Sequence, residues 1–216
     1  MRTRSIVGVG VAVALTALLP AAPLSATGGG DGEEQGGEAT LAQILLSDSA
    51  KDDAEGFDRR QWDYDIVTQA VLLFPDLAAA ASDPDAELTV FLPNDASFKR
   101  LVREITGSWP KTEAEAFAAV VSLGTDTVLA VLQYHIVPNA ISYRDAKASD
   151  GAVLATLLDG SSLTVDVRGR WWKYVELVDA DGDDRDPIVV DPNVGGRASN
   201  GFAHGIDRVL RPIDLP

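Results

Sequence analysis

Two histidines are the residues of this sequence whose type and position could support chemistry. His135 lies in LQYHIVP (132–138), and His204 lies in NGFAHGIDRVLRP (200–212). A neutral imidazole can transfer protons, bind a metal ion, or hold a fold together by donating one hydrogen bond and accepting another. The sequence contains neither an HExxH metal motif nor a GxSxG nucleophile motif. We therefore expect structural histidines, with ligand contact, catalysis or metal binding by His135 as the open alternatives.

The neighbours of the two histidines have structural and contact interpretations as well. Tyr134 carries a large apolar ring with a polar tip, which suits packing with a satisfied hydroxyl or contact with a partner surface. His204 is expected on a strand, and Asp207 then faces the opposite side because side chains alternate along a strand. They cannot form an acid–base pair without a bulge. Asp207 is expected to bind backbone or Arg208, and Asn200 to begin a turn.

The acidic run DADGDDRD (179–186) places carboxylates where they could bind a cation. Asp179, Asp181 and Asp183 alternate like the first ligands of a calcium loop. Gly182 is at the wrong offset for an EF-hand loop, and Val190 stands where the closing glutamate would be. A solvated hairpin tip is the favoured interpretation, and weak calcium binding is the alternative. No other metal site is expected.

Trp171 and Trp172 are adjacent in a segment that is expected to be a strand, so their side chains should point to opposite faces. One indole would pack inward, and the other would lie at the surface or under the acidic run. An exposed indole is suited to stacking on a sugar or to a protein–protein contact. With 33 acidic residues no carboxylate pair for glycoside hydrolysis can be singled out. We expect no catalytic residue and no cofactor.

The composition indicates a folded, acidic protein without cysteine. Of the 216 residues 46% are hydrophobic, and the formal net charge is −15. Such a surface repels nucleic acid and anionic membranes, so neither is an expected partner. The absence of cysteine removes disulfides, thiol nucleophiles and thiolate metal sites. The hydrophobic core must therefore stabilise the fold.

The N-terminal segments differ in composition from the rest of the chain. Residues 1–26 are typical of a secretory signal peptide, with two arginines, an apolar run and small residues up to Ala26. Cleavage is expected near Ala26, with retention as an anchor as the alternative and no membrane insertion after cleavage. Residues 27–40 are rich in Gly and Glu and are expected to form a flexible tether. Residues 41–216 are expected to form one domain.

The first part of this domain has helical periodicity around one strand. Apolar residues in 61–81 recur at three- and four-residue spacing, which predicts an amphipathic helix that Pro75 breaks in two. ELTVFLP (87–93) alternates and is expected to be a central strand, with Asn94 and Asp95 as the cap of the following helix. Further helices are expected at 96–105, 112–123 and 125–137.

The last third of the chain changes to short strand-like runs separated by glycine-containing turns. We expect strands at 152–158, 161–167, 171–180, 186–190 and 203–212. These runs predict an antiparallel β region. Helices followed by strands favour an α+β fold over a βαβ nucleotide-binding fold, and no glycine-rich phosphate loop is present.

Three blocks stand in order along the chain: TVFLPNDASFKRL (89–101), LQYHIVP (132–138) and NGFAHGIDRVLRP (200–212). They resemble the first signature block, the Tyr-His motif and the second signature block of the fasciclin (FAS1) domain family. The resemblance implies a FAS1 fold, an antiparallel β-sandwich or wedge of about seven strands with a helical layer. The fold-defining motif positions would be Thr89, Asn94, Asp95, Asn200, His204 and Asp207.

The resemblance also implies a secreted or cell-surface bacterial protein that binds an extracellular protein or glycan in adhesion, without catalysis. The candidate contact residues are Tyr134, His135 and Trp172. An extracytoplasmic hydrolase or small-ligand carrier is the alternative, and a structural envelope protein without a soluble ligand is a third. A hydrolase should possess a polar cleft with a strongly perturbed acid–base pair, which a binding module should lack.

Overall fold

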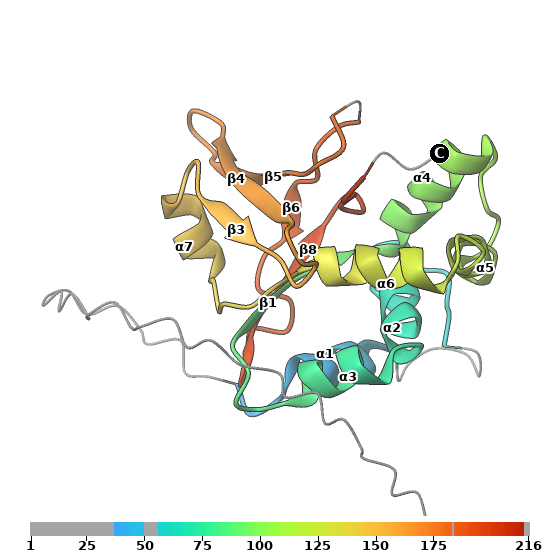
Figure 1. Ribbon diagram of the computed structural model, residues 1–216, viewed down its shortest axis with the longest axis horizontal. Coiled ribbons are helices and arrows are strands. Elements are labelled where there is room, and N and C mark those ends of the chain that lie inside the picture. Colours follow the sequence, from blue (N-terminus) through green and yellow to red (C-terminus); the bar gives the residue numbers. More distant parts are fainter. Residues whose placement is uncertain (1–36, 50–55, 183, 214–216) are drawn as a thin grey trace, which may run out of the picture. The chain divides into compact units, whose positions relative to one another are not determined.

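The computed structural model describes residues 37–49, 56–182 and 184–213 (Figure 1). Its helices are α1 (Leu41–Ser49), α2 (Asp65–Leu72), α3 (Pro75–Ser82), α4 (Asp95–Thr106), α5 (Glu113–Val121), α6 (Thr125–Tyr134) and α7 (Tyr143–Ala148). Its strands are β1 (Leu88–Pro93), β2 (Ile136–Val137), β3 (Val153–Ala155), β4 (Ser162–Arg168), β5 (Tyr174–Val178), β6 (Val189–Asp191), β7 (Arg197–Ala198) and β8 (Gly201–Ile206). Most helices precede most strands, as the sequence predicted.

The domain begins earlier than the sequence predicted. The expected signal peptide and residues 27–36 of the expected tether lie outside the described residues. The end of that tether is bonded to the domain, because the N–H of Gly37 donates to the carbonyl of Arg197 at 2.8 Å and the N–H of Ser199 to that of Ala39 at 2.9 Å. The boundary expected at residue 41 therefore moves to residue 37 or before it.

The larger sheet is mixed rather than wholly antiparallel. Its strands have the order β2-β1-β8-β6, and β7 also pairs with β8. β1 and β8 run parallel along their whole length, from Leu88 opposite Gly201 to Pro93 opposite Ile206. The other pairs are antiparallel. Parallel pairing needs a long crossover, and here the helical layer and the second sheet lie between the two strands in the chain.

The smaller sheet consists of β3, β4 and β5 in antiparallel order. A single antiparallel bridge between Glu176 and Ile188 continues from β5 toward the segment that leads into β6. The described residues thus contain eight short strands in two sheets, close to the expected seven. Figure 1 shows the second sheet beside α7 and the helical layer on the other side of β1 and β8.

β1 separates two hydrophobic cores. Leu88 and Leu92 face the core that the helices share, and Phe91 faces the core between the two sheets. This is the alternation expected from the sequence of the strand. The core between the sheets includes Leu163, Val165, Val175, Leu177 and Ile206. Inward-facing residues from both sheets therefore meet as in a sandwich or wedge.

The helical layer follows the expected breaks. Pro75 is the first residue of α3, where its fixed φ and missing N–H cost nothing, so the segment 61–81 forms two helices. α6 ends at Tyr134, earlier than the predicted 137, and α1 was not predicted. No single helix in the described part of the chain is long and apolar enough to span a membrane; the bent pairs α2–α3 and α5–α6 meet the criterion by length and composition only.

Candidate functional site

His135 is a buried structural group at the end of α6. Its Nδ1 donates to the carbonyl of Val131 at 2.7 Å, and its Nε2 accepts from the backbone N–H of Leu210 at 2.9 Å. The ring is therefore held between α6 and the segment after β8. Burial lowers the pKa of His135 to about 4, so the imidazole is neutral at pH 7.

His204 is bonded in the same way within β8. Its Nδ1 accepts from the N–H of Asn193 at 3.2 Å, and its Nε2 donates to the carbonyl of Ile141 at 2.9 Å. Burial lowers its pKa. Asp207 lies beyond the end of the strand, and its Oδ1 accepts from the backbone N–H of Ile188 at 2.8 Å. The backbone partner expected for Asp207 is present, and the two groups do not act as a pair.

Tyr134 is fully buried between the sheets and α6. Its hydroxyl donates to the carbonyl of Ser162 at 3.0 Å. Burial, with the nearby Asp179 carboxylate, raises the pKa of Tyr134 to about 12. Tyr134 and His135 therefore hold the fold, and neither offers its side chain to a partner on the surface.

The first signature block ties a strand to a helix. Thr89 donates from Oγ1 to the carbonyl of Asn139 at 2.6 Å and accepts from the N–H of Ile141 at 2.8 Å. Asn94 caps α4, since its Oδ1 accepts from the N–H of Ser97 at 3.0 Å. Asp95, also expected to cap this helix, is its first residue, and its carboxylate bonds instead to the N–H of Ile66 in α2. These bonds satisfy polar groups that burial would otherwise leave without partners.

Asn200 does more than begin a turn. Its side-chain amide donates to the carbonyls of Ala81 and Asp83 at 3.0 and 2.9 Å, and its Oδ1 accepts from the N–H of Leu41 at 2.9 Å. One buried amide therefore holds the end of α3, the start of α1 and the start of β8 together. This is a fold-defining role, as the resemblance implied.

The acidic run at 179–186 surrounds an internal cation. Asp179 accepts from the N–H of Arg211 at 2.8 Å and from the N–H of Asp181 at 3.0 Å. The carboxylate of Asp181 pairs with the Arg211 guanidinium at 3.2 Å, and Asp184 and Glu104 contact the same guanidinium. Asp183 lies outside the described residues. One of the three candidate calcium ligands, Asp181, is therefore paired with an internal cation.

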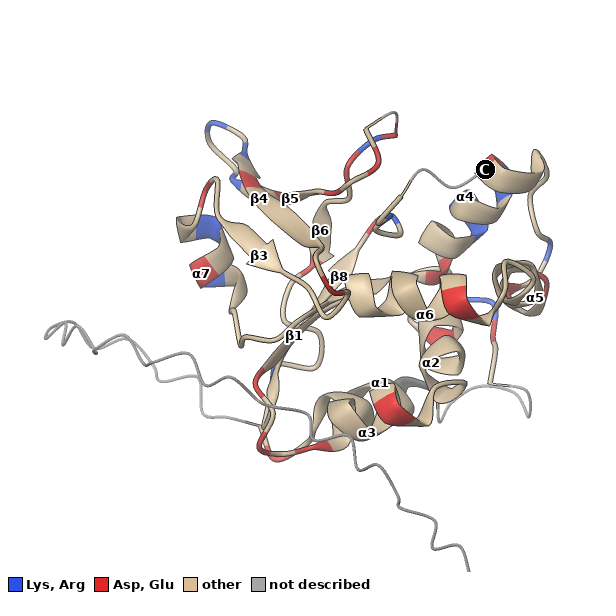
Figure 2. Cartoon of the chain, viewed as in Figure 1, with Lys and Arg blue, Asp and Glu red and all other residues tan. Residues whose placement is uncertain are grey.

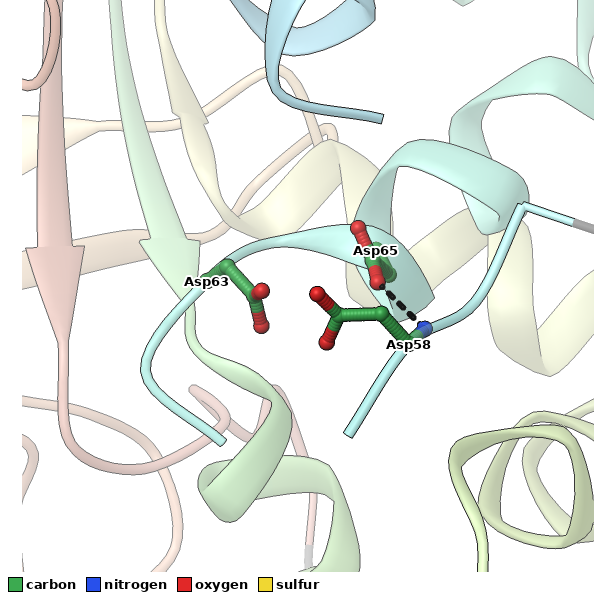
Figure 3. Close-up of side chains that lie close together, drawn as sticks. All are labelled: Asp58, Asp63 and Asp65. Atoms are coloured by element: carbon green, nitrogen blue, oxygen red, sulfur yellow. Dashed lines mark hydrogen bonds between the residues drawn. The ribbon is translucent and has the colours of Figure 1, made fainter. Parts of the chain in front are cut away.

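A buried carboxylate cluster lies at a junction of helix ends that the sequence did not reveal. Asp65, Asp95 and Glu113 are the first residues of α2, α4 and α5. Their carboxylate oxygens lie within 4.8 Å of one another. Asp58 and Asp63 extend the cluster outward, and Figure 3 shows their carboxylates pointing toward each other beside Asp65. The positive ends of three helices therefore meet around the acids.

The cluster contains its own donors and one cation. Glu113 pairs with Lys99 at 2.8 Å, and Asp95 accepts from the N–H of Ile66 at 3.0 Å. The N–H of Asp58 lies 3.1 Å from an oxygen of Asp65 and 3.0 Å from one of Glu113. Carboxylate oxygens are the ligands that Ca²⁺ and Mg²⁺ prefer, but Lys99 and three helix ends already balance much of this charge.

The pKa of Asp95 is strongly raised. Burial, the hydrogen-bonded neighbour Asp63 and the Glu113 carboxylate together raise the pKa of Asp95 to about 9, although the bond from the Ile66 N–H lowers it. A polar cleft of about 840 Å³ opens beside the cluster and is lined in part by Lys99, Lys111 and Glu113. Asp95 is fully buried and does not line this cleft. The acid with the shifted pKa is thus separated from any ligand in the cleft.

The two adjacent tryptophans lie in the loop between β4 and β5 and not in a strand, which corrects the prediction. Trp171 is 82% exposed and Trp172 is 89% exposed, so neither indole packs inward. Gly169 begins the loop with a φ of 93°, and a Cβ there would lie 2.2 Å from the carbonyl oxygen of Trp172. The pairing of β4 with β5 ends at Arg168 and Tyr174, and the turn at Gly169 takes the next residues out of the sheet.

The motif residues and the fold agree with comparisons to known proteins. A model of the Fasciclin domain family matches residues 64–212. The chain belongs to the fasciclin-domain family. Its fold is similar to that of a solved FAS1 domain pair from the insect cell adhesion molecule fasciclin I, with a TM-score of 0.54 and 16% sequence identity. The likeness covers 80% of this chain and 51% of that one, so the fasciclin domain spans about half the length of the pair. No curated protein matches the sequence.

The structure of this fasciclin domain separates the three candidate contact residues. Tyr134 and His135 are buried, and Trp172 is exposed. The carboxylate cluster was missed because each acid looks like an ordinary first-turn residue of its own helix. Acids at the starts of these three helices were a visible signal, but only tertiary packing brings those starts together.

Proposed function

We propose that this fasciclin domain is an extracellular or cell-surface binding module that acts in adhesion and not in catalysis. The observation that carries the proposal is the pair of exposed indoles, Trp171 and Trp172, at the end of the β4–β5 hairpin. Tryptophan and arginine are enriched among residues that dominate binding energies, and a hydrophobic side chain that is fully exposed contributes nothing to the core. The partner is an extracellular protein or glycan, and no cofactor is required.

Two further observations support the proposal. The N-terminal 26 residues are typical of a secretory signal peptide. The similar solved structure comes from a cell adhesion molecule. The polar cleft beside the carboxylate cluster does not favour a hydrolase, because its strongly perturbed acid is buried behind it.

The experiment is a binding assay of the purified, fluorescently labelled protein on intact cells and on extracellular matrix of the source organism. Changing both Trp171→Ala and Trp172→Ala should reduce binding at least tenfold. The matched control is Trp109→Ala, which removes another exposed indole, 55% accessible and 5.0 Å from the Arg103 guanidinium. Saturable binding that is lost in the double variant alone supports the proposal. No binding by the unaltered protein, or equal loss in the control, would contradict it.

A further inference from the structure

The end of the β4–β5 hairpin combines aromatic and cationic side chains. Every residue from Arg168 to Tyr174 is exposed, and the stretch, here called the hairpin tip, contains no acid. Its aromatic members are Trp171, Trp172 and Tyr174, and its cations are Arg168, Arg170 and Lys173. Figure 2 shows basic residues at this loop in a chain whose net charge is −15. The hairpin tip therefore differs in charge from the protein as a whole.

Two of the three cations are available to a ligand. Arg168 is held by Asp166 at 2.7 Å and by Glu176 at 2.9 Å. Arg170 and Lys173 form no ion pair with any residue in the described ranges, and the Arg170 guanidinium lies 5.4 Å from the ring centre of Trp171. A ligand of the hairpin tip should therefore carry negative charge and flat faces on which an indole can stack.

The hairpin tip is a small surface, which favours a narrow ligand. A standard protein–protein interface uses about 20 to 30 residues on each side, far more than the hairpin tip provides. The residues at its base are acidic, with Asp166 and Glu176 in the adjacent strands. Only a ligand that contacts the end of the hairpin, without covering its base, gains from the cations and avoids the carboxylates.

A planar anionic bilayer fits this arrangement less well than a thread-like polymer. Glu176 follows Tyr174 by two strand positions, which corresponds to about 7 Å at the usual rise of a strand. This is shorter than the Debye length of about 8 Å at physiological ionic strength. A bilayer would thus place anionic headgroups within reach of the carboxylates at the base, whereas a linear chain can cross the end alone.

We propose that the hairpin tip binds a linear anionic polysaccharide, with Trp171 and Trp172 stacked on sugar rings and Arg170 and Lys173 paired with acidic groups of the polymer. This inference rests on the proposed function and names the ligand of the same site. Gly169 sets the loop conformation, because its positive φ and the nearby Trp172 carbonyl exclude a side chain.

The test is isothermal titration of the purified protein with defined polymers. Sodium alginate carries carboxylates and dextran sulfate carries sulfates, and each should bind saturably if its acidic group is the one recognised. Neutral dextran of matched length and poly-L-glutamate should bind at least tenfold more weakly, because the first lacks charge and the second lacks sugar rings. Raising NaCl from 50 to 200 mM should weaken binding several-fold, since the contact involves two cations.

Two double variants test the aromatic and the cationic parts of the contact separately. Trp171→Ala with Trp172→Ala, and Arg170→Ser with Lys173→Ser, should each reduce affinity for the anionic polymer at least tenfold. Arg103→Ser with Trp109→Ala removes the other exposed indole–arginine pair and should leave affinity unchanged. The melting temperature of all three should match that of the unaltered protein, because all the altered side chains are exposed.

The outcomes separate this inference from the proposed function. If binding to cells depends on the hairpin tip but neither anionic polymer binds, the proposed polysaccharide ligand is wrong. The proposed function as an adhesion module is then still supported. Cosedimentation with vesicles of phosphatidylcholine and phosphatidylglycerol at 3:1, lost in the tryptophan variant while the polymers stay unbound, assigns the site to lipid instead. Equal affinity for neutral dextran overturns the role of charge. Absence of binding to cells, matrix and polymers contradicts both proposals.

Discussion

His135 makes the stability of the domain sensitive to acid. The unfolded chain takes up a proton at the ordinary pKa of 6.5, whereas the buried imidazole resists protonation until about pH 4. Stability is therefore fully present above pH 6.5 and is lost as pH falls toward 4, by roughly 3 kcal/mol from this residue. Urea denaturation at pH 7.5, 5.5 and 4.5 measures the slope.

The variant His135→Ala should unfold more easily at pH 7.5, by about 1 to 3 kcal/mol, because the buried N–H of Leu210 loses its acceptor. It should also show a flatter dependence on pH between 6.5 and 4, since one titrating group has been removed. An identical slope in the variant and the unaltered protein would show that His135 does not carry the effect. Unchanged stability with lost cell binding would contradict its structural role.

Asp95 has the opposite dependence on pH. Its pKa is raised from 3.8 to about 9, so the folded state holds a proton that the unfolded chain releases. Stability from this group is present below pH 3.8 and is lost as pH rises toward 9. Asp95→Asn keeps an oxygen for the Ile66 N–H and removes the titration. It should raise stability at pH 7 to 8 by about 1 to 3 kcal/mol, measured by urea denaturation. A less stable variant would show that Asp95 is ionised in the fold.

The buried pair of Lys99 and Glu113 should matter mainly when it is broken. The Glu113 side chain is fully buried, so Lys99→Met leaves a carboxylate without its cation and should cost about 3 to 5 kcal/mol. Lys99→Met together with Glu113→Gln should recover much of that loss, because the amide can still accept from the Asp58 N–H. Thermal unfolding of the single and double variants gives the comparison. A double variant that is no more stable than the single one would contradict the explanation.

At the scale of elements, Gly169 determines whether the hairpin tip has the form that presents its indoles. A Cβ at this position would lie 2.2 Å from the Trp172 carbonyl, and φ is 93°. Gly169→Ala should therefore rearrange the loop, weaken binding at the hairpin tip severalfold and lower stability by about 1 kcal/mol. Titration and thermal unfolding measure the two effects. Gly151→Ala, with a similar φ and open space around it, is the control, and binding should survive there.

The spacing of apolar residues predicts a helix or strand correctly where tertiary contacts do not change the local structure. The break at Pro75 and the two faces of β1 followed directly from residue types and spacing, and both are confirmed. Trp171 and Trp172 were assigned to a strand because aromatic residues favour strands, and the turn at Gly169 removed them from it. The parallel pairing of β1 with β8 had no local signal, because the two strands carry no information about their relative direction.

At the scale of the whole molecule, charge opposes folding and favours solubility. With a net charge of −15 the compact state repels itself, and salt screens that repulsion. The melting temperature should therefore rise by several degrees between 20 and 500 mM NaCl at pH 7.5. Binding at the hairpin tip should weaken over the same range, so stability and affinity should change in opposite directions. A melting temperature that falls with salt would show that attractive ion pairs, such as those of Arg211, dominate.

The carboxylate cluster shows the limit of prediction at this scale. Asp65, Asp95 and Glu113 are far apart in the sequence, and from the sequence each looks like an ordinary first-turn acid of its own helix. Their interaction exists only because α2, α4 and α5 direct their N-termini at one point. The same applies to Arg211, whose partners come from α4 and the acidic run. Residue types indicated where charge lies along the chain, but packing decides which charges share a site.

The position of β8 fixes the time at which the domain can fold during synthesis. β8 separates β1 from β6 in the larger sheet, yet it is translated after every other strand that the structure describes. Until it arrives, β1 has only the two-residue β2 beside it, and its other edge is open. Helices can form on the growing chain, but the sheet closes only after translation has passed Ile206. A ribosome that stalls earlier leaves this edge of β1 open, and an unpaired strand edge is a template for aggregation.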